Sequence, residues 1–287
     1  MFICISINPS IAVDTVKKPS KPISYGNTLY VGGSGPGNYT SIQDAVNDSE
    51  YGDTVFVHSY SSPYYENVVV NKSISLIGED RDTTIIDGSD RGNVINISAG
   101  WVSISGFTIQ YYGGHYWVYD AIIYISSDCN TITCNIISNN YKGIYLSGSS
   151  SNTISGNTIS NNGDGIELYK SINNTFKRNT ITNNSCGIFL SGSKLNTITG
   201  NTISNNADGI YLEYSFINFI LGNNFFNKVR DAFFWNSFLN RWNHNYWSRP
   251  RILPKNIFGL MGMFEYLVFP WFNFDWFPAK EPYDIGV

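Results

Sequence analysis

Three carboxylates, Asp164, Glu167 and Asp208, are the residues with the clearest chemical potential in this sequence. A pair of carboxyl groups can hydrolyse a glycosidic bond when they lie about 5–5.5 Å apart with retention of configuration, or about 6.5–9.5 Å apart with inversion. These three residues are therefore weak candidates for a catalytic role. Whether they meet depends on the elements that carry them.

Those elements repeat every 22 residues from Asn130 to Trp247. Two Asn columns run through the repeat: Asn130, Asn152, Asn174, Asn196, Asn218 and Asn240, and Asn135, Asn157, Asn179, Asn201, Asn223 and Asn245. A Gly column (Gly143, Gly165, Gly187, Gly209) changes to Asp231, and four columns are apolar. Such a period indicates a stack of short structural units rather than an ordinary globular domain.

The apolar pattern within each unit alternates with a period of two, as in Ile166-Glu167-Leu168, which favours strands over helices. Short strands separated by Asn, Gly and Ser turns predict an all-β fold, a single-stranded parallel β-helix with 22-residue coils about 4.8 Å apart. The Asn columns are then expected to form ladders at the corners, where Asn tolerates left-handed backbone geometry. We interpret these ladders as structural.

The flanking regions predict a capped solenoid. Residues 1–27 are interpreted as a leader or linker, with a remnant of a signal peptide as one reading; residues 28–247 are the β-helix, and 248–287 an aromatic C-terminal cap. A short helix after Thr40 or Ser41 would close the N-terminal end. The apolar run 257–274 contains Glu265 and Pro270, which argue against a membrane span; a peripheral membrane contact is the alternative.

The repeat is interrupted once, by six extra residues in the loop Tyr111–Asp120. Insertions in solenoids form loops on one face, often the binding face. Next to this loop, two outward columns are expected to share one edge. The first is Ile123, Tyr145, Glu167, Phe189, Tyr211 and Phe233, and the second is Asp120, Lys142, Asp164, Cys186, Asp208 and Arg230.

Aromatic rings beside hydrogen-bonding groups suit sugars, which have apolar faces and polar rims. The predicted ligand-binding residues are His115, Tyr116, Trp117, Asp120, Tyr145, Phe189 and Tyr211. The alternative is structural: aromatic side chains favour cross-strand packing, and Asp before Gly is common in turns. Asp164 and Asp208 would lie roughly 9.6 Å apart along the axis, which is borderline for hydrolysis, so the sequence leans against catalysis.

Charged residues make up 14% of the chain and the net charge is −4. This balance gives no indication of nucleic-acid binding. His58, His115 and His244 are far apart in the repeat, so no metal site is predicted, although Ca²⁺ or Cu remain open as cofactors. Cys129 and Cys134 are not spaced for a disulfide. Candidate glycosylation sequons occur at Asn38, Asn47, Asn71, Asn96, Asn173 and Asn183.

Several segments resemble a known family. Ser41-Ile-Gln-Asp-Ala-Val46, Tyr51-Gly-Asp-Thr-Val-Phe-Val57 and Ser73-Ile-Ser-Leu-Ile-Gly78 resemble the start of pectin-lyase-like right-handed β-helices. The 22-residue unit resembles the NosD-like repeat proteins, described as carbohydrate-binding and sugar-hydrolase-associated, and the tail resembles archaeal surface proteins. The resemblance implies a right-handed solenoid in an exported, extracellular or cell-surface protein, and the family name implies copper.

Three functions follow as hypotheses. The first is an exported or cell-surface protein that binds a polysaccharide or surface glycan, or serves as a scaffold or adhesin. The second is a polysaccharide lyase or glycoside hydrolase that works at the same edge. The third is an accessory protein of copper-site maturation. Neither an oligomeric state nor an anchor can be predicted from the sequence.

Overall fold

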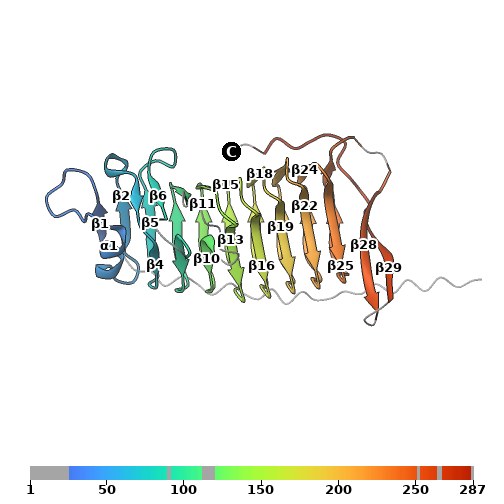
Figure 1. Ribbon diagram of the computed structural model, residues 1–287, viewed down its shortest axis with the longest axis horizontal. Coiled ribbons are helices and arrows are strands. Elements are labelled where there is room, and N and C mark those ends of the chain that lie inside the picture. The colour runs from blue at the N-terminus through green and yellow to red at the C-terminus, as the bar shows by residue number, and fades with distance from the viewer. Residues whose placement is uncertain (1–25, 89–91, 112–119, 251–252, 264–266, 286–287) are drawn as a thin grey trace, which may run out of the picture.

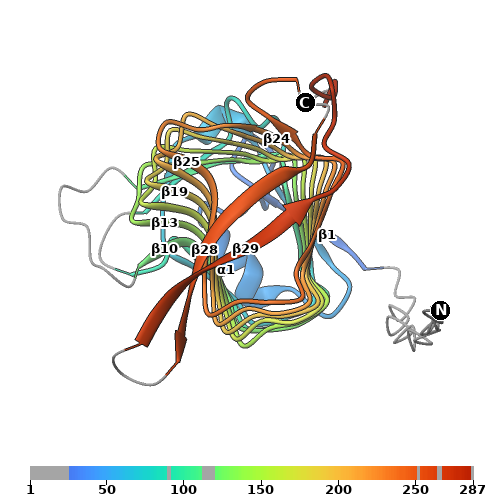
Figure 2. The same cartoon turned by 90° about the vertical axis from the view of Figure 1, so that its right-hand side faces the viewer.

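The computed structural model describes residues 26–88, 92–111, 120–250, 253–263 and 267–285. The chain forms an elongated right-handed parallel β-helix in which successive coils lie side by side from one end to the other (Figure 1). Viewed along the axis, each coil has three sides, so the strands form three stacks (Figure 2). The predicted fold class is therefore confirmed.

The three stacks differ in strand length. The long-strand stack contains β4 (Val68–Val70), β7 (Ile95–Ile97), β10 (Ala121–Ile125), β13 (Lys142–Ser147), β16 (Asp164–Tyr169), β19 (Cys186–Ser191), β22 (Asp208–Glu213) and β25 (Arg230–Trp235). The middle stack contains β1 (Thr28–Val31), β2 (Thr54–Val57), β5 (Ser75–Gly78), β8 (Ser103–Ser105), β11 (Thr131–Thr133), β14 (Thr153–Ser155), β17 (Thr175–Lys177), β20 (Thr197–Thr199), β23 (Phe219–Leu221) and β26 (Arg241–Asn243). The third stack contains β3 (Tyr64–Tyr65), β6 (Ile85–Asp87), β9 (Thr108–Gln110), β12 (Ile136–Ser138), β15 (Thr158–Ser160), β18 (Thr180–Thr182), β21 (Thr202–Ser204), β24 (Asn224–Phe226) and β27 (Tyr246–Trp247).

The apolar columns form the core. Ile144, Ile166, Ile188 and Ile210 stack in register along the long strands and have no exposed surface. Each coil has too little interior to fold alone, so burial against the coils on both sides supplies its stability. The Gly column lies where β13, β16, β19 and β22 begin. A Cβ on Gly187 would approach the Gly209 carbonyl oxygen to 2.6 Å, which explains why no larger residue recurs there.

The Asn columns form the predicted ladders. Asn179, for example, accepts at Oδ1 from the backbone N–H (3.0 Å) and Nδ2 (3.1 Å) of Asn157, and its Nδ2 donates to the Ile154 carbonyl (3.0 Å). The buried amides of this ladder thus have partners in adjacent coils. Two further ladders are not predicted from the sequence. One consists of Asn140, Asn162, Asn184, Asn206 and Asn227. The other consists of Ser149, Ser171, Ser193, Ser215 and Ser237.

The backbone at the corners corrects one expectation. At almost every corner, the residue with positive φ is the one before the ladder residue, such as Asn183 before Asn184, and not the ladder residue itself. The turn puts the preceding residue in the left-handed region, and this aims the following side chain inward. One residue therefore forms the turn, and the residue after it forms the ladder hydrogen bonds.

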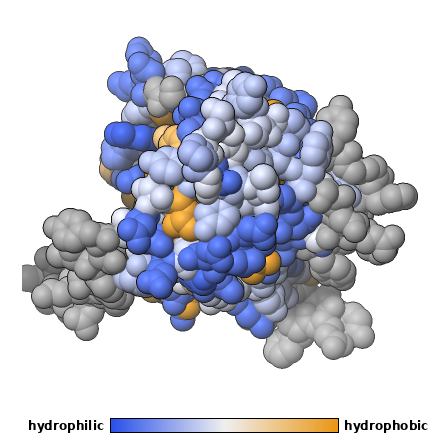
Figure 3. Space-filling view, turned by 90° about the vertical axis from the view of Figure 1, so that its left-hand side faces the viewer, coloured by the Kyte–Doolittle hydropathy of each residue, from blue (hydrophilic) through white to orange (hydrophobic). Residues whose placement is uncertain are grey.

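Both ends of the solenoid are covered. At the N-terminal end, α1 (Ile42–Asp48) is capped by Ser41, and buries Ile42, Ala45 and Val46 as predicted. The surface at this end is mostly hydrophilic or neutral (Figure 3). Beyond it, the 3₁₀ turn η1 (Ser59–Ser61) follows β2.

At the other end, the antiparallel hairpin of β28 (Lys255–Met263) and β29 (Leu267–Asp275) crosses the last coil (Figure 2). Asp275, which is fully buried, terminates one Asn ladder by accepting from the backbone N–H and the Nδ2 of Asn245, and from Trp247 Nε1. No helix in the described ranges is long and apolar enough to cross a membrane.

Candidate functional site

Two outward rows of side chains run along the long-strand stack, and together we call them the strip. The aromatic row comprises Tyr124, Tyr145, Glu167, Phe189, Tyr211 and Phe233. The charged row comprises Lys142, Asp164, Cys186, Asp208 and Arg230. Their members lie directly opposite one another on adjacent coils, and from Lys142 onward they do so at the predicted period of 22 residues.

The first coil of the strip departs from the sequence prediction by one residue. Ile123 pairs with Ile144 and belongs to the buried column, so Tyr124 takes the outward position opposite Tyr145. Ala121, and not Asp120, lies opposite Lys142. The reason is that equivalent positions in this coil and the next one, such as Ile123 and Ile144, are 21 residues apart in the sequence, whereas the prediction uses a period of 22.

The inserted loop is placed only in part. Ile109 pairs with Ile137, which confirms the 28-residue interval and hence the insertion. Asp120 accepts from the Gly92 backbone N–H at 3.0 Å, so this carboxylate is tied to the preceding coil. His115, Tyr116 and Trp117 lie outside the described residues.

Neighbouring rings of the aromatic row pack on one another. Phe189 and Tyr211 are stacked, with centroids 5.1 Å apart and an angle of 14° between their planes, and Tyr211 and Phe233 follow at 5.4 Å and 41°. Tyr124 and Tyr145 are 5.5 Å apart. Because Phe189 and Tyr211 stack with their faces against each other, this part of the row presents ring edges to solvent.

The charged row is largely neutralised by ion pairs. Lys142 Nζ lies 2.8 Å from Glu167 Oε2 on the next coil, with both side chains almost fully buried (8% and 11% exposed), and 3.9 Å from the Tyr145 ring centre. Arg230 donates to both oxygens of Asp208, at 2.7 Å and 2.5 Å, and its guanidinium lies over Phe233 at 4.4 Å. Such bidentate and cation–π contacts fix the side chains in place.

Asp164 is the carboxyl group of the strip whose pKa is most strongly changed. Burial raises its pKa from 3.8 to about 6, and the neighbouring Glu167 carboxylate adds to this, while Lys142 acts in the opposite direction. Burial also raises the pKa of the Cys186 thiol, and Asp164 and Asp208 on either side contribute to the increase. Near neutral pH the protonated forms of both groups are therefore favoured relative to exposed ones.

The three catalytic candidates are thus held in different ways. Glu167 is in an ion pair with Lys142, Asp208 is in an ion pair with Arg230, and Asp164 lies next to Glu167 on the same strand. A glycosidase needs one protonated and one ionised carboxyl group facing the same bond. Asp164 with its raised pKa has the property of the acid, but the two possible partners are each engaged by a cation.

The strip ends in a cavity that the sequence did not reveal. A space of about 320 Å³ lies between the end of the long-strand stack and the hairpin, and is lined by Val229, Arg230, Asp231, Ala232, Phe233, Lys255, Asn256, Ile257 and Phe258. Phe258 extends the aromatic row, with its ring centre 6.1 Å from that of Phe233. Its position breaks the 22-residue spacing, since it comes 25 residues after Phe233, so the repeat could not predict it.

The described residues do not fit a copper ion. No group of three or more His, Cys, Asp or Glu side chains among them could hold a metal ion. His58 is paired with Glu79, and His244 stacks on Phe277. Cys129, Cys134 and Cys186 form no disulfide among the described residues, and the first two lie at left-handed corners on either side of β11. No step through copper can be derived from this arrangement.

Four of the six sequons lie in the coils before Asn130, and two lie in the regular coils. Asn47, Asn71, Asn173 and Asn183 are exposed, whereas Asn38 and Asn96 are partly buried. Asn38 donates from Nδ2 to the Gly32 carbonyl at 2.6 Å. Glycosylation stays a prediction, with the four exposed residues as its better candidates.

Comparison with known proteins identifies the family. The sequence profile described as "Periplasmic copper-binding protein (NosD)" matches residues 46–258, which is most of the chain. The protein therefore belongs to the NosD family, as its sequence resemblance indicated. No curated protein matches the chain.

Solved structures share the fold at low sequence identity. Pectate lyase Pel9A has a TM-score of 0.56 and 16% identity, with 78% of this chain and 80% of that chain covered. The polygalacturonase from Erwinia carotovora ssp. carotovora has a TM-score of 0.54 and 14% identity, covering 77% and 79%. XylC in complex with xylose has a TM-score of 0.57 and 12% identity, covering 76% and 65%. At these identities the likeness establishes the fold.

Proposed function

We propose that this NosD-family protein is exported and binds a polysaccharide along the strip, with one sugar unit seated in the cavity at the hairpin. The observation that carries the proposal is this cavity. Phe233 and Phe258 supply apolar surface, while Asp231, Lys255 and Asn256 supply hydrogen-bonding groups around it. A concave site with a few convergent polar groups is the usual form of a small-ligand site.

The charges of the strip favour a neutral glycan over a polyanionic one. The two cations of the charged row, Lys142 and Arg230, already have carboxylate partners. A uronate polymer would have to displace Glu167 or Asp208 from its cation, and for the almost fully buried Glu167 the loss of its partner is costly. Hydroxyl groups of a neutral sugar can instead hydrogen-bond to the outer atoms of the intact pairs.

The repeat supplies a reason for polymer binding. The same side-chain types recur on successive coils at the spacing of hydrogen-bonded strands, roughly 4.8 Å. A linear glycan that runs parallel to the solenoid axis would meet Tyr211 and Tyr145 in turn after leaving the cavity. Structures with this fold include a pectate lyase, a polygalacturonase and a protein crystallised with xylose, so sugar ligands are compatible with the architecture.

The hairpin provides a matched pair of variants for the test. Phe258 and Phe272 lie directly opposite each other and are 45% and 44% exposed, but Phe258 lines the cavity and Phe272 does not. On an array of neutral and acidic glycans, Phe258→Ala should weaken binding about fivefold to tenfold, as expected for an aromatic anchor, whereas Phe272→Ala should leave it unchanged. Equal losses in both variants would contradict the cavity as the site.

The catalytic alternative is tested by the same ligands. Release of reducing sugar or unsaturated product from any bound glycan, and its loss in Asp164→Ala and Asp208→Ala, would show a lyase or hydrolase. Binding without product over prolonged incubation supports a binding protein or scaffold. Tyr145→Ala combined with Tyr211→Ala tests the rest of the strip, with the exposed Tyr65→Ala on the third stack as the control.

Export is supported by the family, and a membrane contact is suggested by the cap. The family description names a periplasmic protein, which supports export; extracellular or cell-surface location stays a prediction. The hairpin and the segment after it expose Trp271, Phe274, Trp276 and Phe277, so a peripheral membrane contact stays a prediction as well. Vesicle co-sedimentation of the wild-type chain and of Trp276→Ala would test it.

A further inference from the structure

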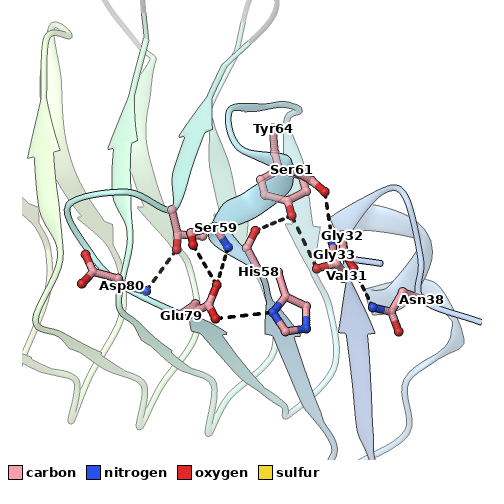
Figure 4. A network of polar contacts seen from close by, with 11 residues as sticks. Val31, Gly32, Gly33, Asn38, His58, Ser59, Ser61, Tyr64, Glu79 and Asp80 are labelled. Atoms are coloured by element: carbon pink, nitrogen blue, oxygen red, sulfur yellow. Dashed lines mark hydrogen bonds and ion pairs between the residues drawn. The ribbon is translucent and has the colours of Figure 1, made fainter. Parts of the chain in front are cut away.

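A second cavity lies at the opposite end of the solenoid, away from the strip. It has a volume of about 690 Å³ and is lined by Tyr30, Gly33, Ser34, Gly35, Asn38, His58, Tyr60 and Glu79. Figure 4 shows His58 between Glu79 on one side and the Gly32–Asn38 loop on the other. This loop packs closely on the imidazole, since a Cβ on Gly33 would lie 3.0 Å from His58 Cδ2.

Aromatic rings form one part of the lining. Tyr30 stacks on His58 with ring centres 6.0 Å apart and planes 18° apart, and Phe56 contacts both edge-on. Tyr30 is 47% exposed and Tyr60 is 87% exposed. In contrast to Phe189 and Tyr211 in the strip, Tyr60 has no ring neighbour among the described residues, so its faces are open to a ligand.

Two side chains of the cavity, Glu79 and Asn38, offer hydrogen-bond acceptors. Glu79 uses Oε2 to accept from the backbone N–H and the hydroxyl of Ser59, both at 2.8 Å, while Oε1 lies 3.6 Å from His58 Nδ1 (Figure 4). Asn38 donates from Nδ2 to the Gly32 carbonyl, so its Oδ1 remains an acceptor. The bonds from Ser59 hold the pKa of Glu79 below its ordinary value, so the carboxylate is charged.

The charge of this site is not neutralised by a strong cation. Within the part of the chain that the structure describes, Glu79 forms no ion pair with Lys or Arg. The cavity therefore combines a carboxylate, acceptor oxygens and accessible aromatic faces. Ligands that satisfy all three carry an ammonium group, which is attracted by a carboxylate and by aromatic faces, and hydroxyl donors around it.

We propose that the N-terminal cavity around Tyr30, His58, Tyr60 and Glu79 binds an amino sugar through its primary ammonium group. The ammonium group lies at Glu79 Oε1, and the sugar ring packs on Tyr60, with its hydroxyl groups donating to Asn38 Oδ1. This site is independent of the strip, from which it differs because its carboxylate pairs with a histidine and not with Lys or Arg.

Isothermal titration of the full chain with glucosamine, glucose, N-acetylglucosamine and n-butylamine tests the proposal. Glucosamine should bind about tenfold more tightly than glucose or N-acetylglucosamine, because a charge-assisted hydrogen bond is lost in both. Equal affinity for glucose would overturn the role of the ammonium group. Equal affinity for n-butylamine would overturn the role of the sugar ring, and no binding of glucosamine would overturn the site.

Two variants locate the binding. Glu79→Gln should reduce the affinity for glucosamine about tenfold and leave that for glucose unchanged; Tyr60→Ala should weaken both. Since Tyr60 is 87% exposed, its removal should not affect folding, which thermal unfolding would verify. Glu213→Gln at the end of β22 is the control carboxylate. Unchanged affinity in both Glu79→Gln and Tyr60→Ala would place glucosamine elsewhere and overturn the proposal.

Discussion

The regular coils and the N-terminal coils satisfy their buried polar groups in different ways. From Asn130 onward, four ladders repeat the same hydrogen bonds in every coil. Before Asn130, individual carboxylates accept these hydrogen bonds without any repetition. Glu66 accepts from Ser41 Oγ and from the backbone N–H groups of Ile42 and Gln43. Asp53 accepts from the backbone N–H groups of Asn27 and Glu50. Repetition therefore marks structural residues, and the unrepeated positions are where ligand sites can arise.

The two candidate sites differ in the same way. The strip belongs to the regular coils, and its charges are paired between coils in the same way as its rings are stacked. The N-terminal cavity belongs to the irregular coils, and its carboxylate and rings remain accessible. A repeating surface tends to satisfy itself, because each side chain has a like-placed neighbour at the distance of adjacent strands.

The largest effect is expected in the ladders. Asn179→Ala removes the acceptor of two bonds from Asn157 and the donor to the Ile154 carbonyl, all in the fully buried interior. Asn157 Nδ2 keeps its bonds to the Ile132 and Ser155 carbonyls, so the Asn157 backbone N–H and the Ile154 carbonyl are the two buried groups that lose a partner. Their loss should lower the free energy of unfolding by about 2–6 kcal/mol. Denaturant unfolding measures this. Asn183→Gly, at an exposed left-handed corner, is the control and should be nearly neutral; a similar loss in both would mean that corner geometry, rather than the ladder, is what matters.

A smaller change, and an increase in the free energy of unfolding, is expected when Asp164 in the strip is replaced. The pKa of Asp164 is raised from 3.8 to about 6, so the folded chain holds this proton more tightly than the unfolded chain. Its contribution to stability is present below about pH 4 and is lost as the pH rises through 6. Asp164→Asn should therefore increase the free energy of unfolding at pH 8 by about 1–3 kcal/mol and have little effect at pH 4.

Unfolding curves of wild type and Asp164→Asn between pH 4 and pH 8 provide the measurement. A constant difference across this range would show that burial of Asp164 does not perturb its proton binding. Glu79 in the irregular coils is expected to show the opposite pH dependence. Hydrogen bonds from Ser59 lower its pKa, so its contribution to stability is present at neutral pH and is lost as the pH falls.

The smallest effect is expected at the cap. Glu66→Gln keeps an acceptor for the N-terminal groups of α1 but removes the charge, which should cost about 1 kcal/mol. Amide hydrogen exchange should show this loss in α1 and leave the ladders unchanged. Asp44→Asn, exposed in the same first turn, is the matched control. A loss of protection that spreads into the regular coils would show that the two regions unfold together.

Much of the fold could be predicted from the sequence, because the period fixes which residues lie opposite one another. The columns of Ile144, Ile166 and Ile188 are buried in register as expected, and the insertion before β10 was recognised from the spacing. The candidate site was predicted less completely. Tyr124 replaced Ile123 in the aromatic row because the coil at the insertion is one residue off the period, which the count of 22 could not reveal.

The sequence by itself thus determined the β-helix, its family and the rows on its surface, since in-register stacking turns a spacing along the chain into a neighbour in space. Only the tertiary structure decided which of those neighbouring side chains form ion pairs and ring contacts. It paired Lys142 with Glu167 and Arg230 with Asp208, and it brought Phe258 to the end of the strip. It also placed Glu79 beside His58 and Tyr30 at the N-terminal end. These contacts join irregular segments and depend on loop and hairpin conformation, which no period encodes.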